Sequence, residues 1–420
     1  MGPVPSRRIV IWITVGVLLA GTAALLWFLL PEASGRAAIR IGVIQSLTGP
    51  DAPDEKPRLA GVQLAVAELN RSGGVVGRRL EIVLRDGESD PAAHAREAER
   101  LVRDERVAVI IAGGRAACAA RVRAVAEEHR SLFLDLTPGD ATEPPSRTLS
   151  LGPSPVARMA PALAWAFERG VSSIFLIGGS DPPAEALRAA ARRTAAAHGV
   201  TVAGDLQLAP GADPAPAARS AAQSGASLVL NAMDPAATPG MLAALRASGL
   251  DREKTFVLST SLEEEASGNR ASPGTGDLAV WSWFTAVGGE EARRFIRDLR
   301  REAGGEAAVN ESVETAYLAV KLWAEAAARA ESAAPDAVLP LISTEHALMP
   351  EGTVVVDPET RLLWRPIRLG RGRHDGGFDV VWDSDAPVRS TAAPFGLTAE
   401  AWGRVVRREG ATAPAQGGAR

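Results

Sequence analysis

Apolar and polar residues alternate along the chain with two periods, which predict short buried strands between helices of about 10–15 residues. Residues 37–44 form an apolar run typical of a buried strand, and residues 57–70 carry apolar positions at helical spacing up to a Ser-Gly-Gly turn. The same alternation continues to residue 136 and recurs between residues 157 and 259. Two such runs predict two doubly wound α/β lobes, each with a parallel sheet covered on both faces.

The last third of the chain has a different pattern. Residues 290–303 and 314–330 have helical spacing, and residues 354–356, 362–369 and 378–382 predict strands of an antiparallel tail. We assign the segments as follows: 1–36 to a cytoplasmic stub, a transmembrane anchor and a linker, 37–153 and 284–345 to lobe I, 154–283 and 346–396 to lobe II, and 397–420 to a partly disordered C-terminal tail.

Ile9 to Leu30 is an uncharged apolar run that follows Arg7 and Arg8. As a helix it would extend roughly 33 Å, enough to cross a bilayer core of ~30 Å. Basic residues stay on the cytoplasmic side, so we expect a single-pass protein of the cell membrane whose C-terminal lobes are extracytoplasmic, that is, periplasmic or extracellular. A cleaved signal peptide is the alternative, but its apolar region is normally 7–15 residues long and ends in a small-x-small site.

Composition excludes several function classes. The net charge of −4 gives no reason to expect a nucleic acid as a partner. The single cysteine excludes an internal disulfide and a metal site built on several thiolates, and the five histidines fall in no metal-binding spacing. No nucleophile with its base is recognisable, so we predict a protein that is not an enzyme and that needs no cofactor or metal.

Ligands of open parallel sheets bind beyond the carboxyl ends of the strands, and this rule selects the loops that follow each predicted strand. The candidate ligand-binding residues in these loops are Ser46, Thr48, Arg115, Cys118, Thr137, Asp181, Asp234 and Glu263. Arg115 attracts most interest, because a guanidinium binds carboxylates as a fork.

Each of these residues also has a purely structural interpretation. Ser46 and Thr48 would simply shape a turn, and Arg115 would be a solvated residue at a helix start. Cys118 would be a small packing residue. Glu263 would belong to the solvated first turn of a helix.

The motifs also carry a resemblance. IRIGVIQSLTGPDA, AELNRSGGVVGRRLE and DGESDP, in this order, resemble type I periplasmic binding proteins, the group that serves branched-chain amino acid, amide and urea uptake. MPEGTVVVDPETRLLWRPIRLGRG and FDVVWDSDAPVRSTAAPFG resemble the urea- and short-chain-amide-binding branch. The resemblance covers about residues 39–396. It implies two lobes with three crossings that close around a small-molecule ligand, and an ABC permease or a membrane sensor as partner.

The expected pocket departs from that branch. The positions of the loop 113–118 that carry hydroxyls in that branch fall on Arg115, Ala116 and Cys118, and the tyrosine that follows GGSD in that branch is Pro182 here. A buried neutral amide needs paired donors and acceptors, so urea and acetamide are poor candidates. Two hypotheses remain: an altered specificity, in which Arg115 clamps an amino acid or a small carboxylate, and a degenerate pocket in an anchored sensory or scaffold protein.

Overall fold

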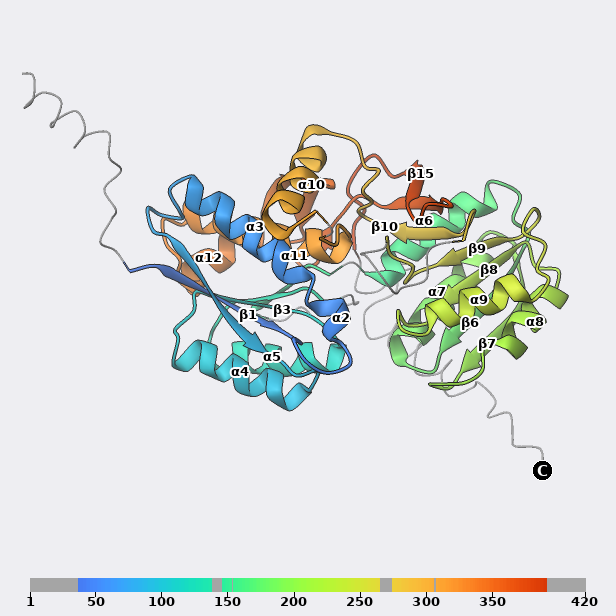
Figure 1. Ribbon diagram of the computed structural model, residues 1–420, viewed down its shortest axis with the longest axis horizontal. Coiled ribbons are helices and arrows are strands. Elements are labelled where there is room, and N and C mark those ends of the chain that lie inside the picture. The colour runs from blue at the N-terminus through green and yellow to red at the C-terminus, as the bar shows by residue number, and fades with distance from the viewer. Residues whose placement is uncertain (1–36, 138–145, 153, 265–273, 306, 391–420) are drawn as a thin grey trace, which may run out of the picture.

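The computed structural model describes residues 37–137, 146–152, 154–264, 274–305 and 307–390, which form two α/β lobes side by side (Figure 1). The predicted anchor at residues 9–30 and the predicted tail at 397–420 lie outside these ranges. Across the described ranges, no helix combines the length and the apolar content needed to span a bilayer.

Lobe I contains a five-stranded parallel sheet in the order β2-β1-β3-β4-β5. Its strands are β1 (Ile39–Gln45), β2 (Leu80–Asp86), β3 (Val109–Ala112), β4 (Phe133–Asp135) and β5 (Thr148–Ser150). The central strands are buried along almost their whole length, which is why they are continuous apolar runs in the sequence.

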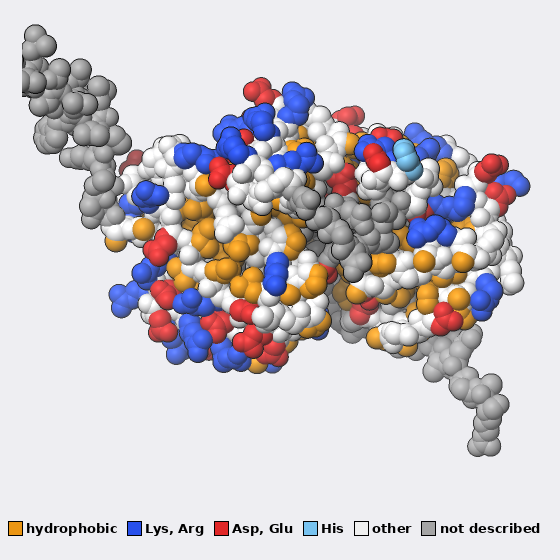
Figure 2. All heavy atoms as spheres, viewed as in Figure 1, with side chains coloured by type: hydrophobic (Ala, Val, Ile, Leu, Met, Phe, Trp, Pro, Cys, Tyr) orange, Lys and Arg blue, Asp and Glu red, His pale blue; other side chains and the backbone are white. Residues whose placement is uncertain are grey.

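Helices cover both faces of this sheet. On one face α3 (Arg58–Arg71) packs against α11 (Glu311–Arg329), although the two are far apart in the sequence, and on the other face α4 (Pro91–Arg103) packs against α5 (Ala116–Glu128) (Figure 1). Two apolar cores fill the space between helices and sheet. The helix α10 (Glu290–Ala303) lies outside α3, and Figure 2 shows its basic side chains gathered on the surface.

Lobe II contains a seven-stranded sheet in the order β15-β14-β10-β9-β8-β6-β7. Its parallel part consists of β6 (Ser173–Gly179), β7 (Thr201–Leu208), β8 (Leu228–Ala232), β9 (Phe256–Ser259) and β10 (Leu278–Trp281), and its antiparallel edge of β14 (Arg368–Gly372) and β15 (Phe378–Asp383). The covering helices are α6 (Pro155–Phe167), α7 (Pro182–Ala197), α8 (Ala215–Gln223) and α9 (Thr238–Ala247). The predicted pair of doubly wound lobes is therefore confirmed.

The C-terminal strands divide between the lobes. The strands β11 (His346–Met349), β12 (Gly352–Val356) and β13 (Leu363–Trp364) form a separate sheet whose buried side chains, together with those near α12 (Pro335–Ile342), belong to the larger core of lobe I. Only β14 and β15 join the sheet of lobe II. The expected single strand at 362–369 is thus two strands in two sheets, because the chain leaves one sheet at Arg365 and enters the other at Arg368.

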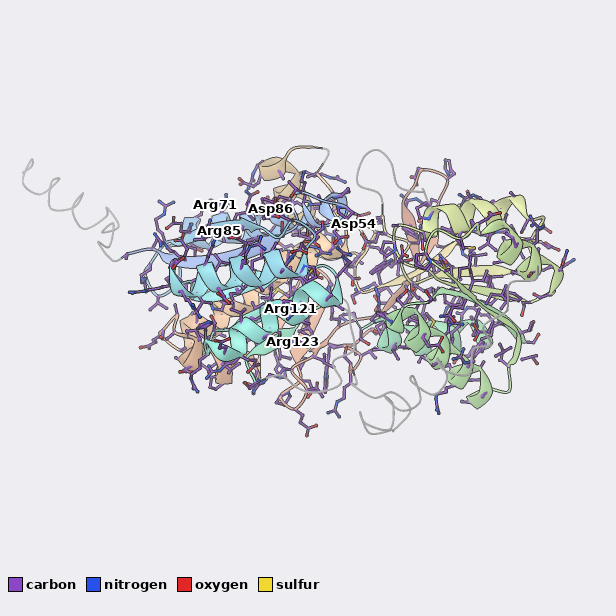
Figure 3. The ribbon with its side chains drawn as sticks, turned by 90° about the horizontal axis from the view of Figure 1, so that it is seen from below. Asp54, Arg71, Arg85, Asp86, Arg121 and Arg123 are labelled. Carbon is purple, nitrogen blue, oxygen red and sulfur yellow. The ribbon has the colours of Figure 1, made fainter. Side chains whose placement is uncertain are left out.

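The main chain passes between the lobes three times: from β5 to α6, from β10 to α10, and from β13 to β14. The short helix α2 (Ala52–Glu55), which the apolar pattern does not predict, lies at the edge of lobe I that faces lobe II, and Asp54 marks this edge in the view from below (Figures 1 and 3). The crossings and α2 together frame the region between the lobes.

Candidate ligand-binding site between the lobes

The segment that follows β1 folds back over the carboxyl ends of the central strands of lobe I. The Glu55 carboxylate accepts the backbone N–H of Ser46 at 2.6 Å and is 99% buried. A Cβ on Gly114, which follows β3, would overlap Oε1 of Glu55. Gly114 also has a φ of +119°, a conformation that favours glycine. The loop after β3 is therefore built around the Glu55 carboxylate.

Arg58 begins α3 and reaches the same sheet edge. Its Nη1 lies 2.9 Å from the position that a Cβ on Gly113 would occupy, so the guanidinium packs against the end of β3. The residue is only 9% exposed, and neither its Nε nor its Nη1 has a hydrogen-bond partner among the described residues. Gln45 at the end of β1 and Thr137 after β4 also carry buried polar side-chain atoms without such a partner.

Lobe II contributes Glu263 from the segment after β9. Asn310, the N-cap residue of α11, donates a hydrogen bond from Nδ2 to Oε2 of Glu263 at 3.2 Å. Burial raises the pKa of Glu263 to about 7, with the Arg58 and Arg158 guanidinium groups opposing and Glu311 reinforcing the shift. Since these charges come from both lobes, Glu263 lies at their junction, and it changes its charge near neutral pH.

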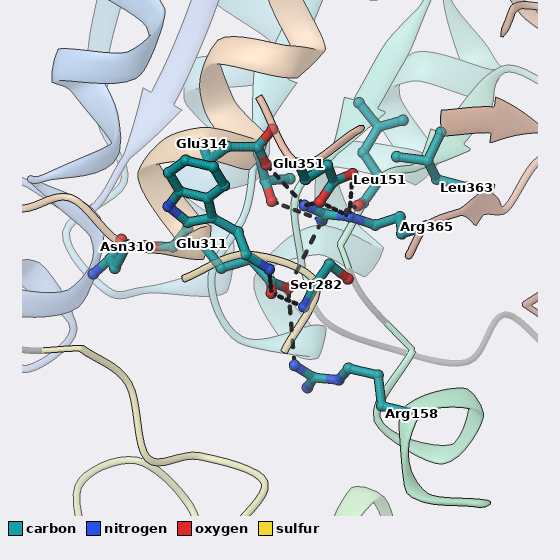
Figure 4. Close-up of polar contacts among 12 residues, drawn as sticks. Leu151, Arg158, Ser282, Asn310, Glu311, Glu314, Glu351, Leu363 and Arg365 are labelled. Atoms are coloured by element: carbon teal, nitrogen blue, oxygen red, sulfur yellow. Dashed lines mark hydrogen bonds and ion pairs between the residues drawn. The ribbon is translucent and has the colours of Figure 1, made fainter. Parts of the chain in front are cut away.

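A buried ion cluster joins the three crossings (Figure 4). Arg365, on the third crossing, binds the Glu314 carboxylate at 2.8 Å and donates to the carbonyl oxygen of Leu151 on the first crossing at 3.4 Å. The backbone N–H of Ser282, on the second crossing, donates to the Glu311 carboxylate at 2.5 Å. Burial and the neighbouring Glu351 charge raise the pKa of Glu314 well above its usual range.

Arg158 of α6 extends this cluster toward Glu263. Its guanidinium lies over the ring of Trp281 at 4.2 Å and 3.8 Å from the Glu311 carboxylate. Glu263, Trp281, Trp283, Asn310 and Glu311 line a space too narrow for a water-sized sphere. Entry of a solute into this region therefore requires the lobes to separate.

The structure places Ser46 and Thr48 in a network within lobe I. The Ser46 hydroxyl accepts the backbone N–H of Ser89 at 3.1 Å, and the Thr48 hydroxyl donates to Asp86 at 2.8 Å. These backbone and hydroxyl donors also hold the pKa of Asp86 below its usual range, against the effect of burial. Both predicted residues thus shape the loops at the sheet edge.

Arg115 and Cys118 also make contacts within lobe I. The Arg115 guanidinium binds Asp51 at 2.7 Å and the carbonyl oxygen of Ser89, and its side chain is 57% exposed. Cys118 is fully buried in α5, and burial raises the pKa of its thiol. Neither side chain belongs to the group around Glu263.

Asp181 and Asp234 lie elsewhere, on the rim of a pocket of about 500 Å³ in lobe II. Each caps a turn: Asp181 accepts the backbone N–H of Ala184 at 3.0 Å, and Asp234 that of Ala237 at 2.8 Å. The remaining lining is mostly apolar, with Leu208, Met233 and Met241. The predicted residues are therefore divided between a lobe I network, the inter-lobe region and this pocket.

Gln45, Glu55, Arg58 and Arg158 are not among the residues predicted from the sequence. The selection rule takes residues in the loops that follow strands, whereas Glu55 ends α2 and Arg58 and Arg158 lie in the first turns of α3 and α6. Within the described part of the chain, no group of His, Cys, Asp and Glu side chains could hold a metal ion.

This architecture, with two parallel α/β lobes, three crossings and a polar region between them, defines a two-lobed binding protein. Residues 39–397 match the model of the periplasmic binding protein domain, and the chain belongs to this family.

Solved structures share the fold. A solute-binding protein of an ABC transporter from Rhodopseudomonas palustris, in complex with 3,4-dihydroxybenzoic acid, is 18% identical with a TM-score of 0.75, covering 84% of this chain and 98% of that one. Another from the same species, in complex with p-hydroxybenzoic acid, is 21% identical with the same TM-score and coverage. A leucine-binding protein from Thermotoga maritima is 17% identical with a TM-score of 0.70, covering 82% of this chain and 98% of that one.

A curated relative matches only a short segment. The limonene hydroxylase of Geobacillus stearothermophilus is 23% identical over 113 residues, which are 27% of this chain and 21% of that protein. The match spans about a fifth of that relative, so it transfers no activity to this chain.

Proposed function

We propose that this chain is the extracytoplasmic solute-binding component of an ABC-type importer and that it holds a small polar ligand between its lobes. The observation that carries the proposal is the set of buried polar groups from both lobes around Arg58 and Glu263. Family membership and the solutes named for the similar structures support it. Amino acids, amides, urea and small carboxylates are the candidate ligands.

The mechanism follows from the crossings. The lobes separate about these three segments, a solute enters, and closure removes it from water, so that an ABC permease can recognise the closed form. We propose that residues 9–30 anchor the chain in the membrane, with the lobes outside, which would keep the binding protein close to its permease.

One observation favours a second candidate function. The side chains of Glu263, Trp281 and Trp283 line a space that has no room for a water-sized sphere. A membrane-anchored sensory or scaffold protein with an altered pocket would need no solute there. Genes for a permease and an ATPase beside this one would support uptake, whereas a neighbouring kinase or regulator would support sensing.

A thermal-unfolding screen of the full chain in detergent tests the proposal. The panel contains amino acids, urea, neutral amides and small carboxylates. A solute at 100 times its dissociation constant should stabilise the folded chain by ~2.7 kcal/mol. No stabilisation by any compound would refute solute binding and favour the second candidate.

A control variant locates the binding. Gly240 lies in α9 on the wall of the lobe II pocket, with no other group within 4 Å of where a Cβ would be. Gly240→Phe should fill that pocket and leave the inter-lobe region unchanged. Stabilisation that persists in this variant supports the inter-lobe site, and its loss would assign the ligand to lobe II.

A further inference from the structure

We propose that Arg58, together with Gln45 and Thr137, forms a carboxylate-binding subsite, and that the ligands of this chain are small carboxylates. This inference rests on the proposed function and names its ligand class. It differs from the sequence-based hypothesis in its key residue, because Arg58, and not Arg115, has donor groups without a partner in the described part of the chain.

The charge of Arg58 sets it apart from the other buried arginines. Six arginines are buried in the described part of the chain, and five of them have a carboxylate within 4 Å. These five pairs are Arg147–Asp336, Arg158–Glu311, Arg188–Glu185, Arg365–Glu351 and Arg368–Asp383. Arg58 forms no ion pair with any described residue. An unpaired buried cation is strongly unfavourable, so Arg58 is suited to an anion that comes from outside the described chain.

Gln45, Arg58 and Thr137 lie at the same edge of the lobe I sheet. Gln45 ends β1, Arg58 packs on Gly113 at the end of β3, and Thr137 follows β4. Since β1, β3 and β4 are adjacent in the sheet, three donors that have no partner among the described residues lie along one sheet edge. An amide N–H, a guanidinium and a hydroxyl are complementary to the two oxygens of a carboxylate.

Glu263 of lobe II is the acidic group near this subsite. Glu263 is near enough to feel the Arg58 charge, but its high pKa of about 7 makes it a weak counterion at neutral pH. An ionised Glu263 would compete with a ligand carboxylate for Arg58, whereas a protonated Glu263 would not. Carboxylate binding should therefore weaken as the pH rises through about 7.

The competing arginine is already engaged. Arg115 binds Asp51 and the Ser89 carbonyl at the surface of lobe I. It is thus a matched control for Arg58: the same residue type on the same lobe, but paired and exposed.

The experiment compares acids with their amides on the full chain in detergent. Benzoate, 4-hydroxybenzoate and leucine are titrated by calorimetry beside benzamide, 4-hydroxybenzamide and leucinamide, with urea as a neutral solute. We expect at least one acid to bind and its amide to bind at least about 100-fold more weakly. The Arg58→Met substitution should weaken the binding of that acid by about 30-fold or more. Arg58→Lys should retain part of the affinity, because it keeps the charge and loses the fork. The affinity of the Arg115→Met chain for the acid should stay within about twofold of the affinity of the parent chain.

Stability separates a binding role from a structural one. Loss of an unpaired buried charge should raise the unfolding temperature of the ligand-free Arg58→Met chain, whereas a structural arginine would lower it. If the Arg58→Met chain does not fold, Thr137→Val tests the same subsite, and we expect it to lower the affinity for the acid by about fivefold.

The outcomes separate the two proposals. Equal binding of acid and amide, or an unchanged affinity in Arg58→Met, overturns the subsite. Binding of urea or an amide without any acid also overturns it but leaves the solute-binding function standing. Binding of no compound at all overturns both.

Discussion

The Arg365 guanidinium donates from Nε to both carboxylate oxygens of Glu351 at 2.9 Å, and both side chains are at least 97% buried. Arg365 lies on the third crossing, so this pair fixes the segment about which the lobes would move. Removing one partner of a buried pair leaves the other charge uncompensated. We expect Arg365→Met to destabilise the chain by about 3–5 kcal/mol in urea unfolding.

A surface pair provides the control for this variant. Arg373 binds Asp375 at 3.0 Å, but both side chains are more than a third exposed. Exposed ion pairs contribute about 0–1 kcal/mol to the free energy of unfolding, so Arg373→Met should change the stability of the chain little. Similar losses of stability in both variants would show that the buried Arg365 pair stabilises the chain no more than an exposed pair does.

A glycine substitution tests the packing of Glu55. Gly114→Ala puts a methyl group against the Glu55 carboxylate and forces a non-glycine residue to a φ of +119°. We expect a loss of about 1–3 kcal/mol in thermal or urea unfolding. Gly240→Ala, in a helix with open space, should instead stabilise by about 0.5–1 kcal/mol. A Gly114→Ala chain as stable as the parent would mean that Glu55 moves away without loss.

Most of the fold could be predicted from the sequence, because the long strands are apolar runs and the helices have clear spacing. Ile39–Gln45 lies within two residues of the predicted bounds, and Arg58–Arg71 lies within one. The shorter strands β5, β10 and β11 and the helix α2 were missed, since three or four residues carry no measurable period. The break after Arg365 was missed as well, although Pro366, which has no backbone N–H to donate to a sheet, is a local signal for it.

The site was harder to predict than the fold, for a physical reason. A sequence indicates which loops lie at a sheet edge, but not which of their polar groups are already paired. Arg115 and Arg58 are the same residue type, and the sequence alone does not distinguish a paired arginine from an unpaired one. Only the structure shows that Arg115 has Asp51 as a partner and that Arg58 has none among the described residues.

Cys118 should be unreactive in the folded chain. Its side chain is fully buried, and burial raises the pKa of the thiol, so little thiolate is exposed to a reagent. A disulfide reagent should modify it at least about 100-fold more slowly in buffer than in denaturant, since reaction requires opening of α5. Rapid modification in buffer, followed by absorbance, would show that α5 opens readily.

Glu263 should make the stability of the chain depend on pH. Burial raises its pKa from 4.5 to about 7 in the folded chain. The folded state therefore holds the proton more tightly than the unfolded state, and the resulting stability is complete below about pH 4.5 and is lost as the pH rises through about 7.

Glu263→Gln mimics the protonated form and retains an oxygen acceptor for Asn310. Urea unfolding should give this variant about the stability of the parent near pH 4, but about 3 kcal/mol more near pH 8. Glu253→Gln, at an exposed glutamate, should show no such difference. An equal effect of Glu263→Gln at both pH values would mean that Glu263 does not titrate between them, and the predicted pH dependence of carboxylate binding would then lose its basis.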